Sequence, residues 1–318
     1  MNFMIKTIPF EMAGYRLDRA LAELFPEYSR SRLQTWIKQG RVWVDQEQLR
    51  CKDSVKGGEV IELHAEAEVV TTLEAEELPL DIVFEDSELL IINKPAGLVV
   101  HPAAGNWSGT LQNGLLFYAP ILSTIPRSGI VHRIDKETSG LLMIAKSLTA
   151  HAHLVNQLQS RTVQREYLAI TQGRMTSGGT VDEPIGRHPV NRKRQAVVES
   201  GKMAITHFRV LTRYQQHTLI GVTLETGRTH QIRVHMAHIH YPLLGDPVYG
   251  GRFRLPKDCG AELATQLQGF KRQALHAAKL GLIHPGTGAY CEWTADLPVD
   301  MDKLTKALAT NDKIYGQR

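Results

Sequence analysis

Residues 129–142 read Gly129-Ile-Val-His-Arg-Ile-Asp-Lys-Glu-Thr-Ser-Gly-Leu-Leu142. The β-branched residues of the first half predict a strand over residues 129–135, and a polar turn follows it. Because side chains alternate along a strand, Arg133 and Asp135 would share one face where the strand ends. A strand end suits a fixed catalytic acid, but aspartate also caps turns often. The residues alone leave both interpretations of Asp135 open.

Short strands are predicted on both sides of this stretch, often with no helix between them. They cover residues 82–84, 89–92, 141–145, 166–171, 208–212 and 219–225. Helical periodicity is found mainly in residues 150–159 and 231–238. Since strands follow one another directly, we expect residues 79–318 to form an α+β domain with a mixed, mostly antiparallel sheet.

The first 63 residues predict a small helix–helix–strand module. Apolar residues at positions 17, 20, 21 and 24 have helical spacing, and Pro26 ends that helix. A second helix, with Leu33, Trp36 and Ile37 on its apolar face, would end at Gly40. Short strands at 42–44 and 60–63 complete the module, which we expect to be an α/β domain. Residues 64–78 are acidic and lack an apolar period, so we expect a linker there.

Charge is distributed unevenly along the 318 residues. The net charge is only +4, but residues 62–88 hold ten acids and no lysine or arginine, so the remaining residues carry +14. This basic bulk favours a polyanionic partner. The three widely spaced cysteines suggest neither a disulfide framework nor a cysteine zinc site, and a reducing cytoplasm fits them best. No apolar run approaches the ~18 residues that a membrane helix needs.

A basic cluster lies on the second predicted helix. Between residues 28 and 41 there is no acid, and the basic residues are Arg30, Arg32, Lys38 and Arg41. Such a cluster can track a phosphate backbone, although a solvated helix face would have the same composition. A second basic stretch, residues 187–194, lies in a proline-containing loop. Two basic stretches in two domains favour a long nucleic-acid track.

A second motif reads Glu225-Thr-Gly-Arg-Thr-His-Gln-Ile-Arg-Val-His-Met236 and passes from a strand through a glycine turn into a helix. This geometry can direct Arg228 or Arg233 into a cleft, where a guanidinium can pair with a carboxylate or a phosphate. We expect Arg228 to bind the substrate. The alternative is an ordinary salt-bridged helix start.

Four histidines cluster in and after this motif: His230, His235, His238 and His240. No acid lies among them, and the His-Glu-x-x-His arrangement of zinc hydrolases is missing. We therefore expect no metal at this place.

Tyr167 is the remaining candidate for chemistry. An aromatic residue in a strand is usually part of the core, but a tyrosine ring can also stack on an extruded base, as recognition of single-stranded RNA requires.

Three motifs together resemble those of the RluA-type RNA pseudouridine synthases. They are His132-Arg-Ile-Asp-Lys-Glu-Thr-Ser-Gly140, Arg165-Glu-Tyr167 and Thr226-Gly-Arg-Thr-His-Gln-Ile-Arg-Val-His235. Residues 91–102 and 243–250 extend the similarity over almost all of residues 79–295. The first module resembles an S4 RNA-binding domain. The resemblance implies a pseudouridine synthase fold that follows an S4 domain.

The family resemblance also implies roles for individual residues. Asp135 would be the catalytic aspartate and Tyr167 the active-site aromatic. Arg233 would pair with the aspartate, and Arg133 would help to displace the target base. Ile134 stands where leucine is usual in the family, a change that should leave the strand intact.

By this resemblance the protein isomerises specific uridines to pseudouridine in large-subunit (23S) ribosomal RNA, without a cofactor. Its partner would be the 23S RNA or the assembling large ribosomal subunit. We expect a cytoplasmic monomer with no membrane contact. The alternative is a non-catalytic RNA-binding protein that uses the S4-like module, and it predicts tight RNA binding without a product.

Overall fold

The computed structural model describes residues 2–26, 28, 30–65, 73–102, 105–192, 194–256 and 258–315, and only the backbone of residues 2, 31, 32 and 65. The chain divides into two compact units, residues 1–73 and 74–318. The boundary falls inside the segment 64–78 that the sequence predicts as a linker. Each unit has a hydrophobic core of its own.

The first unit, in its described residues, packs a three-stranded antiparallel sheet on two α-helices. In chain order its elements are β1 (Asn2–Thr7), η1 (Phe10–Met12), α1 (Leu17–Leu24), α2 (Arg30–Lys38), β2 (Val42–Val44) and β3 (Val60–Ala65). The apolar positions predicted to face inward, among them Leu17, Leu21 and Leu33, are buried. Gly40 has a φ of 71° and ends α2 as predicted, because glycine adopts this left-handed conformation without strain.

Strand β1 is absent from the sequence-based prediction. It pairs with β3, which places β3 between β1 and β2. Met4 packs against the core, whereas Phe3 and Ile5 are more than half exposed. Apolar residues on both faces of the strand hide the alternation by which a half-buried strand is recognised.

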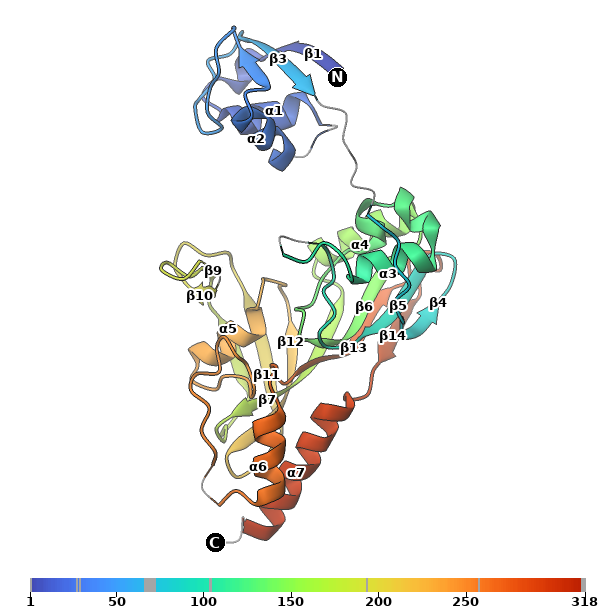
Figure 1. Cartoon of the computed structure of the whole chain (residues 1–318), viewed down its shortest axis with the longest axis vertical. Helices are drawn as coiled ribbons and strands as arrows, with labels where there is room; N and C mark the ends of the chain where they lie inside the picture. The colour runs from blue at the N-terminus through green and yellow to red at the C-terminus, as the bar shows by residue number, and fades with distance from the viewer. Residues whose placement is uncertain are drawn as a thin grey trace. The chain divides into compact units, whose positions relative to one another are not determined.

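The second unit is built around one large sheet (Figure 1). Its strands are β4 (Ile82–Glu85), β5 (Leu89–Lys94), β6 (Ser139–Ala145), β7 (Gln164–Gln172), β8 (Gly179–Asp182), β11 (Ile205–Arg213), β12 (His217–Leu224), β13 (Leu275–Ile283) and β14 (Tyr290–Thr294). The order across the sheet is β4-β5-β6-β13-β7-β12-β11-β8, and β14 pairs with β13. Among the described residues only β6 and β13 are parallel. The predicted mixed, mostly antiparallel α+β sheet is therefore confirmed.

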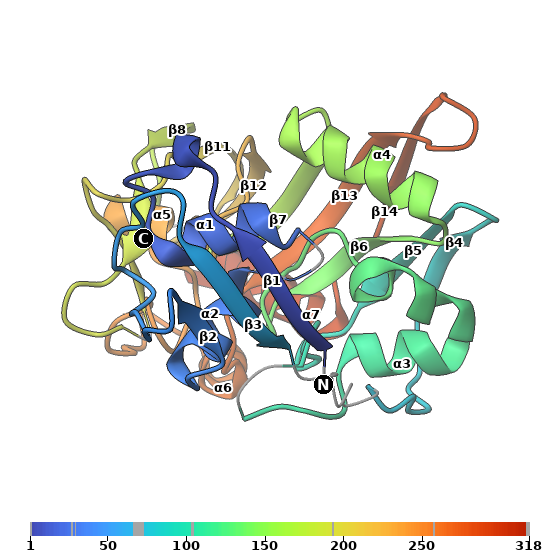
Figure 2. The ribbon, with the colours of Figure 1, turned by 90° about the horizontal axis from the view of Figure 1, so that it is seen from above.

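Helices cover both faces and one end of this sheet. They are α3 (Leu111–Tyr118), α4 (Leu148–Gln159), α5 (Gln231–His238), α6 (Ala261–Gly269) and α7 (Val299–Tyr315), with η2 (Pro120–Thr124) and η3 (Pro126–Gly129) between α3 and β6. Helix α4 packs on the alternate residues Leu141 and Met143 of β6 (Figure 2). Helices α6 and α7 pack together at one end of the second unit (Figure 1). A short hairpin of β9 (Ile185–Arg187) and β10 (Gln195–Val197) stands apart from the sheet.

The strand predicted over residues 129–135 is wrong. Arg127, Ser128 and Gly129 have φ values of 53°, 52° and 78°, so the chain turns sharply before this segment. A Cβ on Gly129 would lie 2.0 Å from the carbonyl oxygen of Ala145, which explains why glycine is needed at this close approach. Ile130 forms a single bridge to β6, and residues 131–135 continue as an unpaired segment.

Residues 74–80 pack on α3. The Asn113 side chain donates to the carbonyl of Glu74 at 2.8 Å, and the Glu76 carboxylate accepts from the amide of Gly109 at 2.9 Å. These contacts assign the end of the acidic segment to the second unit. No helix in the described residues is long and apolar enough to cross a membrane.

Candidate active site

A pocket of about 560 Å³ opens in the second unit beside Asp135. Three chain segments form most of its wall: the residues before β6, the end of α4 with the start of β7, and the loop from β12 to α5. Its walls carry six arginines (Arg127, Arg133, Arg161, Arg165, Arg228 and Arg233) but only two acids, Asp135 and Glu225. The pocket therefore suits an anionic ligand with one carboxylate placed among cations.

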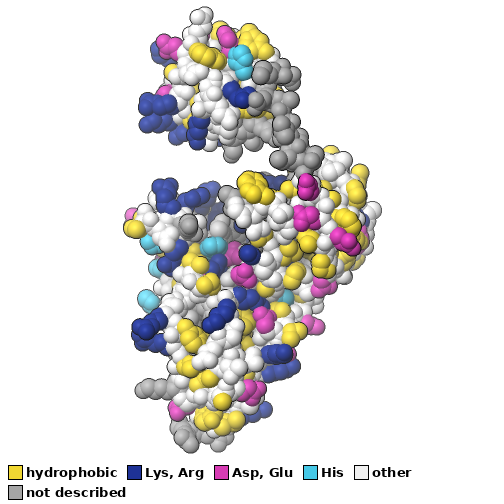
Figure 3. All heavy atoms as spheres, viewed as in Figure 1, with side chains coloured by type: hydrophobic (Ala, Val, Ile, Leu, Met, Phe, Trp, Pro, Cys, Tyr) yellow, Lys and Arg dark blue, Asp and Glu magenta, His cyan; other side chains and the backbone are white. Residues whose placement is uncertain are grey.

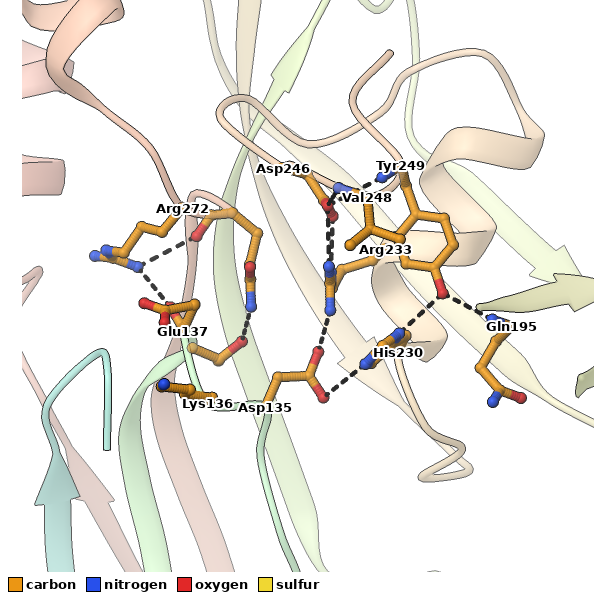
Figure 4. Close-up of polar contacts among 12 residues, drawn as sticks. Asp135, Lys136, Glu137, Gln195, His230, Arg233, Asp246, Val248, Tyr249 and Arg272 are labelled. Atoms are coloured by element: carbon orange, nitrogen blue, oxygen red, sulfur yellow. Dashed lines mark hydrogen bonds and ion pairs between the residues drawn. The ribbon is translucent and has the colours of Figure 1, made fainter. Parts of the chain in front are cut away.

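Arg233 joins Asp135 to a second, fully buried carboxylate (Figure 4). Its Nη1 donates to Asp135 Oδ2 at 2.9 Å, while Nε and Nη2 donate to the two oxygens of Asp246 at 2.7 and 2.9 Å. Asp246 also accepts the backbone amides of Val248 and Tyr249. The guanidinium is thus held on one side, and its remaining nitrogen points at Asp135.

The charges in this triad are fixed by their neighbours. Burial raises the pKa of Asp246, but hydrogen bonds and charge from Arg233, with the two amides, hold it below its ordinary value. Burial opposes the charge of Arg233, yet Asp246 and Asp135 together raise the pKa of the guanidinium above its usual range. Arg233 therefore stays protonated and provides a permanent cation at one oxygen of Asp135.

His230 faces the other oxygen of Asp135, with Nε2 at 3.9 Å from Oδ1. Its Nδ1 lies 2.8 Å from the Tyr249 hydroxyl, which accepts the amide of Gln195 at 2.9 Å (Figure 4). The hydroxyl, which accepts from Gln195, can donate its own proton to Nδ1, and that arrangement puts the imidazole proton on Nε2, toward Asp135. Burial lowers the pKa of His230, although the charge of Asp135 opposes this shift. The His230 ring therefore lies beside the oxygen of Asp135 that Arg233 does not bind.

Tyr167 lies on β7 and belongs both to the core and to the pocket wall. Only 7% of it is exposed, and burial raises the pKa of its phenol. Its hydroxyl makes no hydrogen bond to any residue that the structure describes. The ring is thus a fixed apolar surface whose hydroxyl remains open to a ligand.

Arg133 and Arg228 lie on the pocket wall in different environments. Arg133 is exposed and has no partner among the described residues. Arg228 is half-buried, and its Nε donates to the carbonyl of Met203 at 3.0 Å. The start of α5 is tied by Gln231, whose side chain accepts the Arg228 amide and the Thr226 hydroxyl. The start of α5 is therefore held by Gln231, and the ion pair of Arg233 with Asp246 holds its first turn as well.

The model of the RNA pseudouridylate synthase family matches residues 88–238, and that of the S4 domain matches residues 16–61. Ribosomal large subunit pseudouridine synthase D of Pseudomonas aeruginosa is 56% identical over 308 residues, which cover 97% of this chain and 96% of that protein. The chain belongs to the RNA pseudouridylate synthase family. The resemblance found in the motifs is confirmed.

Other members of the family agree with this assignment. Ribosomal large subunit pseudouridine synthase D of Escherichia coli (strain K12) is 51% identical over 303 residues, 95% of this chain and 93% of that protein. Among solved structures, human RNA pseudouridylate synthase domain containing 4 superposes with a TM-score of 0.57 at 26% identity. The superposed region covers 72% of this chain and 93% of the human chain. The fold is therefore that of the pseudouridine synthases.

The S4-domain match includes the basic residues of the first unit. Arg30 donates to Asp18 of α1 at 2.8 Å, so one charge of the cluster has an acidic partner from the neighbouring helix. Lys38 is exposed and Arg41 half-buried, and the side chain of Arg32 lies outside the described residues. Figure 3 shows lysine and arginine side chains gathered along one side of this unit.

The histidines of α5 have separate surroundings. His235 is buried, and its two ring nitrogens lie 2.8 Å from the Thr206 hydroxyl and 2.9 Å from the Glu183 carbonyl. Across the described residues no group of three His, Cys, Asp or Glu side chains is placed to hold a metal.

The sequence did not identify four residues of the site: Arg165 and His230 on the pocket wall, and Asp246 and Tyr249, which bind Arg233 and His230. Asp246 and Tyr249 lie in the segment 243–250 that carries the resemblance, so the signal was present without a role attached. His230 was considered only as a metal ligand, and its place beside Asp135 depends on a left-handed φ of 57° that no pattern predicts.

Proposed function

We propose that this protein converts specific uridines of large-subunit (23S) ribosomal RNA to pseudouridine, with Asp135 as the catalytic carboxylate. The observation that carries this proposal is the Asp135 carboxylate, held at one oxygen by Arg233 inside a cationic pocket. The choice of RNA rests on the relatives named for the large ribosomal subunit, which match nearly the whole chain.

The reaction breaks the C1′–N1 bond of uridine, turns the uracil within the site and forms a C1′–C5 bond. It conserves atoms and oxidation state, so it needs no redox cofactor. What it needs is a carboxylate at the junction of sugar and base. There it attacks C1′, removes the C2′ proton or stabilises a cationic sugar. Because Arg233 occupies Oδ2, Asp135 has Oδ1 available for this task.

Tyr167 is proposed to hold the base. Its ring is fixed by burial at the pocket wall, and a planar base stacks well on a tyrosine. Stacking keeps the detached uracil near the sugar while it turns. It also helps to exclude water, which would otherwise capture C1′ and turn the isomerase into a glycosidase.

Two arginines are proposed to bind the RNA around the flipped nucleotide. The exposed Arg133 can fill the space that the extruded base leaves in the RNA. Arg228 lines the pocket, and its guanidinium would contact a phosphate.

The S4-like unit is proposed to extend the RNA contact. Arg30, Arg32, Lys38 and Arg41 would follow the phosphate backbone of the 23S RNA or of the assembling subunit. Residues 1–63 would form this domain, and the linker expected over residues 64–78 would end before Glu74, where the chain already packs on the catalytic unit. Since the substrate is ribosomal RNA, we place the protein in the cytoplasm and expect it to act as a monomer.

The test is a map of pseudouridines in 23S RNA from cells that lack this protein. One or more pseudouridines should be missing and should return when the wild-type chain is expressed. Expression of the Asp135→Asn variant should not restore them. A map identical to that of unmodified cells would contradict the proposed function.

A further inference from the structure

Arg165 occupies an unusual place in the pocket wall. It lies on β7 two residues before Tyr167, and the burial pattern of the strand puts both side chains on the same face. Only 9% of Arg165 is exposed. The exposed part of the Arg165 side chain lines the pocket that contains Asp135.

The Arg165 guanidinium is buried without an acidic partner among the described residues. In this part of the chain no hydrogen bond or ion pair reaches the Arg165 side chain, and its Nε is fully buried without a partner. The acids on its own strand and on the pocket wall are engaged elsewhere, and Asp135 is bound to Arg233. Glu166 lies on the opposite face of β7, within ion-pair distance of Arg209 and Lys279, and Glu225 is bound by His207 and Arg161.

The surrounding backbone makes room for the guanidinium. A Cβ on Gly227 would lie 2.9 Å from Arg165 Nη1, so the loop after β12 can pass over the guanidinium because residue 227 has no side chain. The charge also acts on its neighbours. Burial, followed by the charge of Arg165, lowers the pKa of His132 to about 3. An unpaired cation in such a place is costly, and that cost is offset when an anion binds.

We propose that Arg165 binds the uracil base and stabilises the negative charge that the base acquires when its bond to the sugar breaks, an inference that rests on the proposed function. As C1′–N1 breaks, the electron pair stays on N1 and spreads to the O2 and O4 carbonyls. Residues i and i+2 of a strand are about 7 Å apart, so a base stacked on Tyr167 presents its edge to Arg165. Two N–H groups of the guanidinium can then donate to a carbonyl.

This assignment balances the charges of the reaction. Asp135 faces the sugar, which becomes cationic at C1′, while Arg165 faces the base, which becomes anionic. When C5 attacks C1′, the electron pair forms the new bond and both charges disappear, after which the proton leaves C5 and N1 takes up a proton. A phosphate is the less suitable anion for Arg165, because the more accessible Arg133 and Arg228 are placed for the backbone whereas Arg165 is buried beside Tyr167.

The experiment compares Arg165→Met, which keeps most of the side-chain length and removes the charge, with Arg209→Met. Arg209 is 71% exposed on β11 and does not line the pocket, so its substitution controls for net charge. Single-turnover rates and RNA affinities are measured for one rRNA fragment carrying uridine, or 5-fluorouridine, at the target position. Loss of the original nucleoside is followed by mass spectrometry after digestion.

Arg165→Met should slow the loss of uridine by roughly 100-fold, as the removal of one preorganised donor to a developing anion does. The factor by which the substitution slows the reaction should be clearly smaller with 5-fluorouridine, because fluorine itself stabilises the anion of the leaving base. RNA affinity should not change, and Arg209→Met should behave as wild type in all four measurements.

Three results would overturn the inference. Equal slowing on both RNAs would mean that Arg165 does not sense the charge of the base. A weaker affinity with an unchanged rate at saturation, and a salt slope reduced by about one, would assign Arg165 to a phosphate. A wild-type rate for Arg165→Met would leave it without a role, while the proposed function would survive because uridine is still converted.

Should Arg165→Met fail to fold in thermal melting, Gly227→Ala replaces it. The added methyl group displaces the guanidinium, while Arg165 itself and its charge remain. The variant should therefore also slow the loss of uridine more than the loss of 5-fluorouridine. If the wild-type protein converts uridine in no large-subunit RNA, it is the proposed function that fails.

Discussion

At the scale of single residues, Arg233 binds the buried Asp246 and also holds Asp135. One substitution shows whether the bond to Asp246 stabilises the fold more than an exposed ion pair does. Arg233→Met removes the only cation bonded to the fully buried Asp246 among the described residues. An unpaired buried carboxylate should lower the free energy of unfolding by about 3–5 kcal/mol. Chemical denaturation measures this loss. Lys306→Met, which breaks the exposed pair with Asp302, should cost no more than about 0.5 kcal/mol. Similar losses in the two variants would contradict the structural task of Arg233.

Tyr167 gives a second prediction at this scale. If its ring holds the base by stacking, Tyr167→Phe should retain most of the single-turnover rate, and Tyr167→Ala should lose at least about tenfold, since stacking contributes roughly 1–3 kcal/mol per base. A phenylalanine variant that binds RNA normally but stalls would instead give the hydroxyl a part in proton transfer. Equal, near-wild-type rates for both variants would mean that Tyr167 has only a structural role in the core.

The candidate site was only partly predictable at the residue scale. The pairing of Asp135 with Arg233 spans 98 residues, so no local pattern contains it, and it followed from the resemblance alone. The structure now brings the two side chains together. Asp246 and Arg165 could not be recognised from the residues, because their importance comes from burial: one is a buried acid with a partner, the other a buried cation without one.

At the scale of elements, helix α1 contributes a pH dependence to the first unit. Burial raises the pKa of Asp18, but hydrogen bonds from Arg30, Arg16 and Gln34 lower it from 3.8 to about 2. A carboxyl group with a lowered folded-state pKa stabilises the fold above its unfolded pKa, and the contribution is lost as pH falls through the folded pKa.

The difference in free energy of unfolding between wild type and Asp18→Asn should therefore be constant above pH 4 and shrink between pH 4 and 2. It is measured on the full chain from the transition that unfolds α1 and α2. A difference that stays the same down to pH 2 would show that Asp18 gains nothing from its three donors.

Several elements were predicted close to their observed bounds. Helix α5 was predicted with its observed bounds and β7 within two residues of them, whereas α3 was missed because Gly114 and a run of apolar residues blur its period. The strand expected at 129–135 failed for another reason. Its alternation is real in part, since Ile130 and Ile134 are buried and Arg133 is exposed, but the consecutive positive φ angles before it deny it a partner strand.

At the scale of the whole molecule, the first unit should add RNA contacts to those of the second and so raise the RNA affinity of the full chain. Removal of residues 1–73 should leave a folded unit, because the second unit has its own core. RNA affinity should fall, and its dependence on salt should become shallower, since Arg30, Lys38 and Arg41 leave with the deleted unit. Filter binding over a range of salt concentrations measures both quantities. An unchanged slope and affinity would make the basic cluster a solvated helix face.

The central claim is that Asp135 performs the chemistry of uridine isomerisation. The most direct measurement is single-turnover conversion of uridine to pseudouridine in a 23S RNA fragment by wild type and by Asp135→Asn, with RNA affinity measured in parallel. The amide keeps the shape of the side chain and removes its charge, so we predict equal binding, product with the wild type and none with the variant. Conversion by Asp135→Asn at about a tenth of the wild-type rate or faster, a loss far smaller than removal of an essential catalytic group causes, would contradict the account.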